Sequence, residues 1–76
     1  MVEQLTEIIC RVGEIKTLAP DEDYREVGVA SVNQLLILME IEETLGISIP
    51  DDLFIHARTV RDLQEIIYDL KNGVSR

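Results

Sequence analysis

The chain has 76 residues and a formal net charge of −8, from 15 acidic and seven basic side chains. A chain this short buries only roughly 60% of the surface that its unfolded form exposes, which favours a binding or carrier role over a walled active site. Its negative field disfavours nucleic acid and anionic membranes as partners and attracts proteins that carry basic patches.

The first predicted element is an amphipathic helix over residues 2–16. Its apolar residues recur three or four positions apart, which is the period of one helix face. These residues are Leu5, Ile8, Ile9, Val12 and Ile15.

Residues 17–30 have no sustained period and are predicted to form a long loop. Connections of this length in a small domain are usually functional or packed down by their own side chains, and we expect Tyr24 and Val27 to anchor this one. The acidic run Asp21-Glu22-Asp23 lacks the glycine and glutamate that a calcium loop needs at its sixth and twelfth positions. We therefore expect no metal there.

Three further helices are predicted, which makes the chain all-α. The second helix covers residues 31–45 and ends before Gly46, a residue suited to a left-handed C-terminal position. A short third helix is expected over about 52–57 after Pro50, capped by Asp51 or Asp52. The last helix is expected over about 60–72, because Thr59 and Asp62 have the spacing of a capping box. Residues 1–76 are interpreted as one domain.

The second helix has more apolar residues than one core-facing side needs. Ile37, Leu38, Ile41 and Leu45 cluster on one side, at about 100° per residue. Val32, Leu36 and Met39 lie nearly opposite, with Leu35 at their flank. An outward apolar stripe inside a charged rim is what a docking surface needs, and Met suits contact with several partners. The alternative is that the bundle covers the second helix on both sides.

The ordered set of residues from the start of the second helix onward resembles the acyl carrier protein family. The resemblance covers nearly the whole chain, without gaps from about residue 28 to residue 70. It rests on Gly28-Val29-Ala30-Ser31-Val32, Leu35, Leu38, Met39, Ile41, Glu42, Glu43, Ile49-Pro50-Asp51-Asp52 and Thr59-Val60.

This resemblance implies a four-helix bundle with three longer helices, one short helix and a long loop between the first two. It implies that Ser31 receives 4′-phosphopantetheine from coenzyme A and that the chain carries a thioester-bound cargo without being an enzyme. The implied partners are a phosphopantetheinyl transferase and acyl- or aminoacyl-handling ligases, synthases or transferases with basic docking patches. We expect these partners to contact Val32, Leu36, Met39, Glu40, Glu42, Glu43, Asp51 and Asp52.

Three positions depart from the family pattern. Ala30 stands where most members have an aspartate that helps the modifying transferase to recognise its target, and Val32 stands where leucine is usual. Leu36 replaces an acidic residue of many carriers and makes the docking face more apolar, which suggests partners unlike those of general fatty acid synthesis. A specialised fatty acid, polyketide or related pathway is expected, and the cargo stays open.

A second hypothesis leaves Ser31 unmodified. Ser31 followed by Gln34 has the spacing of a capping box, so the serine could serve only as a helix cap. The chain would then be a helical adaptor that binds partners noncovalently through the outward face of the second helix.

The remaining candidates are interpreted as ordinary residues. His56 has no second histidine and no nucleophile to work with, and Cys10 has no partner cysteine. One cysteine excludes an intramolecular disulfide, and no apolar run reaches the roughly 18 residues of a membrane span. We expect a soluble, cytoplasmic, free-standing monomer.

Overall fold

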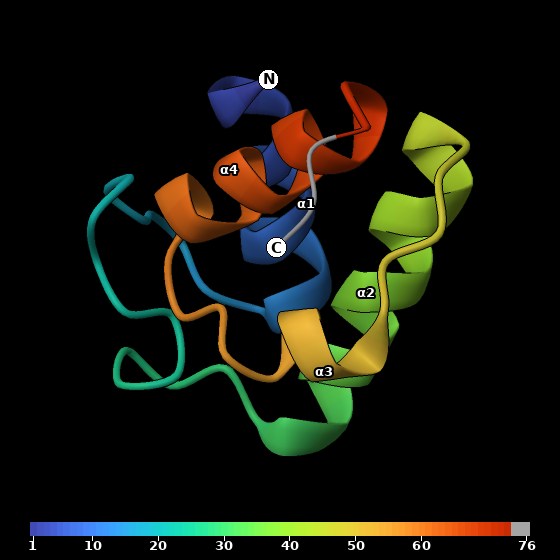
Figure 1. Cartoon of the computed structure of the whole chain (residues 1–76). Helices are drawn as coiled ribbons and strands as arrows, with labels where there is room; N and C mark the ends of the chain where they lie inside the picture. Colours follow the sequence, from blue (N-terminus) through green and yellow to red (C-terminus); the bar gives the residue numbers. More distant parts are fainter. Residues whose placement is uncertain (74–76) are drawn as a thin grey trace.

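The computed structural model describes residues 1–73, and within them the chain is all-α, as predicted. Four helices follow one another: α1 (Val2–Gly13), α2 (Ser31–Leu45), α3 (Asp51–Phe54) and α4 (Val60–Lys71). In Figure 1, α1 lies at the centre of the bundle and is flanked by α2 and α4. The long connection between α1 and α2 forms one side of the molecule, and in this view α3 overlaps the first half of α2.

The core is one apolar cluster to which all four helices and the three connections between them contribute. The buried residues of α1, α2 and α4 keep the three- and four-residue spacing seen in the sequence. The core consists of Leu5, Ile8, Ile9, Leu18, Tyr24, Val29, Ile37, Leu38, Ile41, Ile49, Phe54, Ala57, Val60, Leu63, Ile66 and Ile67.

Helix α1 ends earlier than residue 16, the predicted end. Glu14 takes a left-handed conformation (φ 59°), and its N–H and that of Ile15 both donate to the carbonyl of Cys10. Gly13, the last residue of the helix, lets Val29 pack directly against the helix backbone at this end. The apolar period that continues through Ile15 therefore reflects packing of the loop and not a longer helix.

Helix α3 differs from the prediction at both ends. It covers Asp51–Phe54 with Pro50 at the N-cap, and no side chain caps it, so the expected cap by Asp51 or Asp52 is wrong. Residues 55–57 continue as turns, in which the N–H of Ala57 donates to the carbonyl of Phe54 at 3.0 Å.

The end of α2 and the start of α4 follow the predicted chemistry. Gly46 closes α2 in the left-handed conformation with φ 65°. Thr59 caps α4 and accepts from the N–H of Asp62 at 3.0 Å. The carboxylate of Asp62 reaches back to the N–H of Arg58 at 3.0 Å, so each of the two side chains satisfies one backbone donor at the start of α4.

Candidate functional site

Ser31 is the first residue of α2 and lies exposed at the surface. The N-cap is Ala30, whose extended backbone (φ −65°, ψ 152°) leads into the helix without a side-chain hydrogen bond. The Gln34 amide does not reach back in a capping box but donates to the carbonyl of Val29 at 3.2 Å. The interpretation of Ser31 as a helix cap is therefore wrong, because the serine stands one position too far along the chain.

The first turn of α2 suits a phosphate group attached to the Ser31 oxygen. No hydrogen bond within residues 1–73 occupies the Ser31 hydroxyl, and the first turn contains no acidic residue. Both neighbours, Ala30 and Val32, are exposed and leave the hydroxyl accessible. The partial positive charge of the helix start favours an anion there, although the carboxylate of Glu14 approaches this turn through the Asn33 amide at 3.4 Å.

An apolar strip, formed by Val32, Leu35, Leu36 and Met39, runs along α2 from Ser31. Their exposed fractions are 68%, 58%, 47% and 56% respectively, whereas Ile37 and Ile41 on the other side are fully buried. The bundle therefore covers one side of α2 and leaves this strip open to solvent. Single exposed apolar residues are ordinary on proteins, but these four lie in one row and form a contiguous apolar surface.

The five acidic residues predicted to surround this strip fall into two groups. Glu40 forms an ion pair with Arg11 at 3.2 Å, which joins α2 to α1. Glu42 accepts a hydrogen bond from the N–H of Ile49 at 2.8 Å, which joins α2 to the segment that follows it. Glu43, Asp51 and Asp52 are exposed. Of the five, these three form no ion pair within residues 1–73.

The long loop is held by residues from the far end of the chain. Tyr24 is fully buried. Its hydroxyl donates to the carbonyl of Ala57 at 3.0 Å, and its N–H donates to the carbonyl of Arg58 at 2.9 Å. Burial raises the pKa of Tyr24 to about 12. Val27, predicted as the second anchor, is 38% exposed, and Leu18 and Val29 are buried in its place.

Two carboxylates of the acidic run in this loop form ion pairs with arginines. Asp21 pairs with Arg61, and Asp23 pairs with Arg58. Burial alone would raise the pKa of the Asp23 carboxyl, but the hydrogen bond from Arg58 holds it below its ordinary value. The run therefore fastens the loop to the start of α4.

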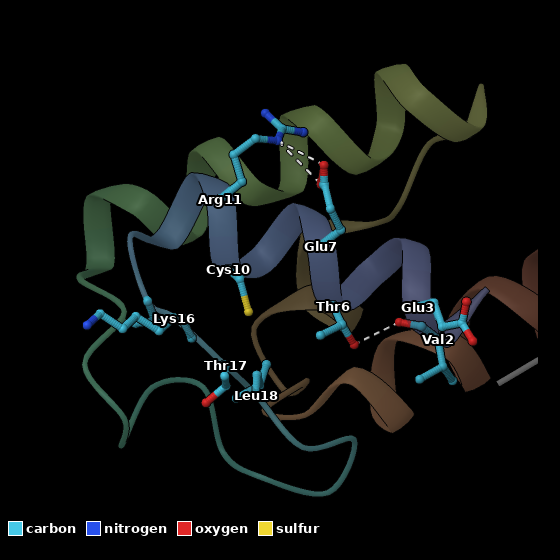
Figure 2. A pocket seen from close by; sticks show the side chains of 10 residues that line it. Val2, Glu3, Thr6, Glu7, Cys10, Arg11, Lys16, Thr17 and Leu18 are labelled. Atoms are coloured by element: carbon cyan, nitrogen blue, oxygen red, sulfur yellow. Dashed lines mark hydrogen bonds and ion pairs between the residues drawn. The ribbon is translucent and has the colours of Figure 1, made fainter.

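A hollow of about 780 Å³ lies along α1, away from Ser31. Figure 2 shows Cys10 pointing its sulfur atom toward the chain segment that holds Thr17 and Leu18. Burial, and secondly the charge of Glu7, raise the pKa of the Cys10 thiol, which keeps it protonated and poorly nucleophilic at neutral pH. No residue of α2 or α3 lines this hollow.

Three further kinds of feature bear on function within the described part of the chain: the single histidine, clusters of metal-ligating side chains, and helices that could span a membrane. His56 is exposed just after α3. No group of three metal-ligating side chains occurs among residues 1–73. None of the helices there is long and apolar enough to cross a bilayer.

Sequence reasoning missed the role of Arg11, which contacts both Glu7 and Glu40. The pair with Glu7 has the four-residue spacing that a helix brings together and could have been predicted. The pair with Glu40 spans 29 positions and depends on how α1 packs against α2.

Comparison with known proteins identifies related chains. Residues 3–67 match the family model described as "Phosphopantetheine attachment site". The chain is also 35% identical over 66 residues to a probable acyl carrier protein of Caulobacter vibrioides (strain NA1000 / CB15N), a match that covers 87% of this chain and 74% of that protein.

Proposed function

Since this chain belongs to the acyl carrier protein family, whose prosthetic group is 4′-phosphopantetheine, we propose that Ser31 is its attachment residue. The observation that carries the proposal is the position of Ser31: exposed, with a free hydroxyl, at the start of a 15-residue helix that lacks a side-chain cap. A serine there can enter the active site of a transferase while the core stays folded.

The chain acts as a carrier and not as an enzyme. When attached, 4′-phosphopantetheine supplies a terminal thiol that holds a cargo as a thioester. The protein contributes a rigid attachment point, because Ser31 begins a 15-residue helix that is fixed to the rest of the bundle through the buried residues Ile37 and Ile41. A flexible tether on a rigid point presents the cargo to successive active sites at high effective concentration.

The family interacts with phosphopantetheinyl transferases and with acyl-handling enzymes. For this chain we place their contacts on the apolar strip, with Glu43, Asp51 and Asp52 as the acidic residues that attract basic partners. Leu36 makes the strip continuous from Val32 to Met39. This continuity supports a pathway other than general fatty acid synthesis, such as a specialised fatty acid or polyketide pathway. We place the protein in the cytoplasm as a monomer as part of the same proposal.

Intact-mass measurement tests the attachment. The protein is incubated with coenzyme A and a broad-specificity phosphopantetheinyl transferase, and the wild type should gain the mass of one 4′-phosphopantetheine group. The Ser31→Ala variant should gain none, and Ser48→Ala, which changes an exposed serine beyond α2, should gain the same mass as the wild type. A wild-type protein that no transferase modifies would instead be an unmodified adaptor.

A further inference from the structure

The segment that leads into α2 has few contacts at two of its residues. Ala30, the N-cap, has no side chain that could bind the free N–H groups of the first turn. A Cβ atom at Gly28 would meet no atom within 4 Å in the described part of the chain. Both residues are exposed, and so is Ser31. The direction in which the chain enters α2 must therefore be fixed by other residues.

Val29 is the anchored residue of this segment. Its side chain is 4% exposed and packs against the backbone of Gly13 at the end of α1. Its N–H donates to the carbonyl of Tyr24 at 3.1 Å, and Tyr24 is itself fully buried. The position of Val29 is thus set both by α1 and by the long loop. Only Ala30 separates this anchored residue from Ser31.

Gln34 joins the anchored residue to the helix. Its side-chain Nε2 donates to the carbonyl of Val29 at 3.2 Å, and its backbone N–H donates to the carbonyl of Ala30 at 3.1 Å. The side-chain bond closes a ring that contains Ala30 and the first turn of α2. Gln34 follows Ser31 by three positions, so the two side chains are neighbours on the helix surface. Gln34 therefore holds the chain on both sides of Ser31.

A capping side chain and Gln34 fix the same peptide group by different bonds. A cap at position 30 would accept a hydrogen bond from an N–H of the first turn, whereas Gln34 donates to the carbonyl that precedes the cap. Either bond holds the peptide group before Ser31 in one orientation relative to α2. The Gln34 side chain is half-buried, so water competes with its bond less than at a fully exposed site.

We propose that Gln34 is a positioning residue for the attachment of 4′-phosphopantetheine to Ser31. The inference rests on the proposed carrier function. In the attachment, the Ser31 oxygen forms a bond to the phosphorus that carries pantetheine, and the P–O bond of the coenzyme A pyrophosphate breaks. The adenosine bisphosphate part leaves, and the hydroxyl proton passes to a base of the transferase. A displacement of the attacking oxygen by about 1 Å can cost about 100-fold in rate, so the orientation that Gln34 fixes affects this step.

Gln34→Met tests the role of the side-chain bond, because methionine keeps the length of the side chain and removes its donor. The values of kcat and KM are measured for a broad-specificity phosphopantetheinyl transferase with saturating coenzyme A. The value of kcat should fall about fivefold, because the hydroxyl is held less well for reaction. The value of KM should stay within about twofold, because the apolar strip is unchanged.

Gln64→Met is the matched control. Gln64 is also half-buried and also lies in a helix, α4, but its side chain makes no hydrogen bond within residues 1–73. This variant should keep the kcat and the KM of the wild type.

A second comparison tests whether Gln34 does the work of a cap. In the Ala30→Asp background, the new carboxylate can accept from the N–H groups of the first turn and fix the same peptide group. Gln34→Met should then lower kcat by less than about twofold, against about fivefold when residue 30 is alanine.

An unchanged kcat in Gln34→Met would overturn the proposal, and so would equal losses of kcat in the two backgrounds. A loss confined to KM would overturn it as well, because Gln34 would then belong to the surface that the transferase binds. Circular dichroism at the assay temperature checks the helix content, and Gln34→Leu replaces Gln34→Met if that variant is not folded. A wild-type protein that never gains the prosthetic group would remove the carrier function too, whereas these outcomes in a modified protein remove only the role of Gln34.

Discussion

A Cβ atom at Gly13 would stand 2.9 Å from Cγ2 of Val29, closer than carbon atoms pack without one of them moving. Gly13→Ala should therefore destabilise the protein by about 1 kcal/mol, since crowding of about 1–3 kcal/mol exceeds the roughly 1 kcal/mol that alanine adds to a helix. Urea unfolding followed by circular dichroism measures the change. Adding Val29→Ala should relieve the crowding, so two additive losses would contradict this close approach.

Tyr24→Phe should lower the free energy of unfolding by about 1 kcal/mol, because the carbonyl of Ala57 loses its buried donor. Urea unfolding measures the change.

The raised pKa of Tyr24 predicts that the protein loses stability at alkaline pH. Its pKa is about 12 in the folded protein and about 10 in the unfolded chain, so the unfolded chain loses its proton first as pH rises. Its contribution is complete below pH 10 and is lost as pH rises from 10 to 12.

Unfolding experiments between pH 9 and 12 check the alkaline limit. The wild type should lose stability more steeply than Tyr24→Phe over this range. Tyr68→Phe is the matched control, because Tyr68 is 62% exposed and its removal should leave the steep loss in place. Parallel pH profiles for the wild type and Tyr24→Phe would contradict the assignment.

Ala30→Asp should stabilise α2 by about 1 kcal/mol, because it supplies a side-chain acceptor at an N-cap that has none. The thermal midpoint and the urea midpoint should both rise. Thr59→Ala is the converse change at α4 and should cost about 1 kcal/mol. Ala30→Asp should also speed modification by a general transferase, and a variant with neither gain would show that Ala30 is not the cap.

Leu36→Glu should lower kcat/KM for the transferase about fivefold while leaving the melting temperature close to that of the wild type, because Leu36 is 47% exposed and belongs to the apolar strip. Ile37→Glu, at the adjacent buried position, should unfold the protein. If Leu36→Glu also unfolds it, the side chain contributes to the core and the strip is not a free surface.

The parts of the fold that depend on local pattern could be predicted from the sequence. The helical period over α2, the left-handed position of Gly46 and the cap at Thr59 each need only neighbouring residues. The exposure of Leu36 follows from the same period, because the opposite side of the helix already supplies the core.

The parts that depend on distant contacts could not be predicted. From the sequence, Glu40 is expected to be a free carboxylate beside the apolar strip. In the structure it is paired with Arg11, which lies 29 positions away in the chain and comes close only because α1 packs against α2. The sequence allows Ser31 as the N-cap of α2, but the N-cap in the structure is Ala30, one residue earlier. Which of the two residues is the cap depends on the backbone angles at the end of the loop. Nothing in the local sequence fixes those angles.

The pinning of the long loop has a consequence for the order of folding. The ties at Asp21, Asp23 and Tyr24 join residues 33 to 40 positions apart, and all of them lead to the segment just before or within the first turn of α4. Contacts across such separations form only after the intervening chain has closed. These ties can form only after the start of α4 has come close to the loop, so the loop should gain protection from hydrogen exchange during refolding no earlier than α4 does.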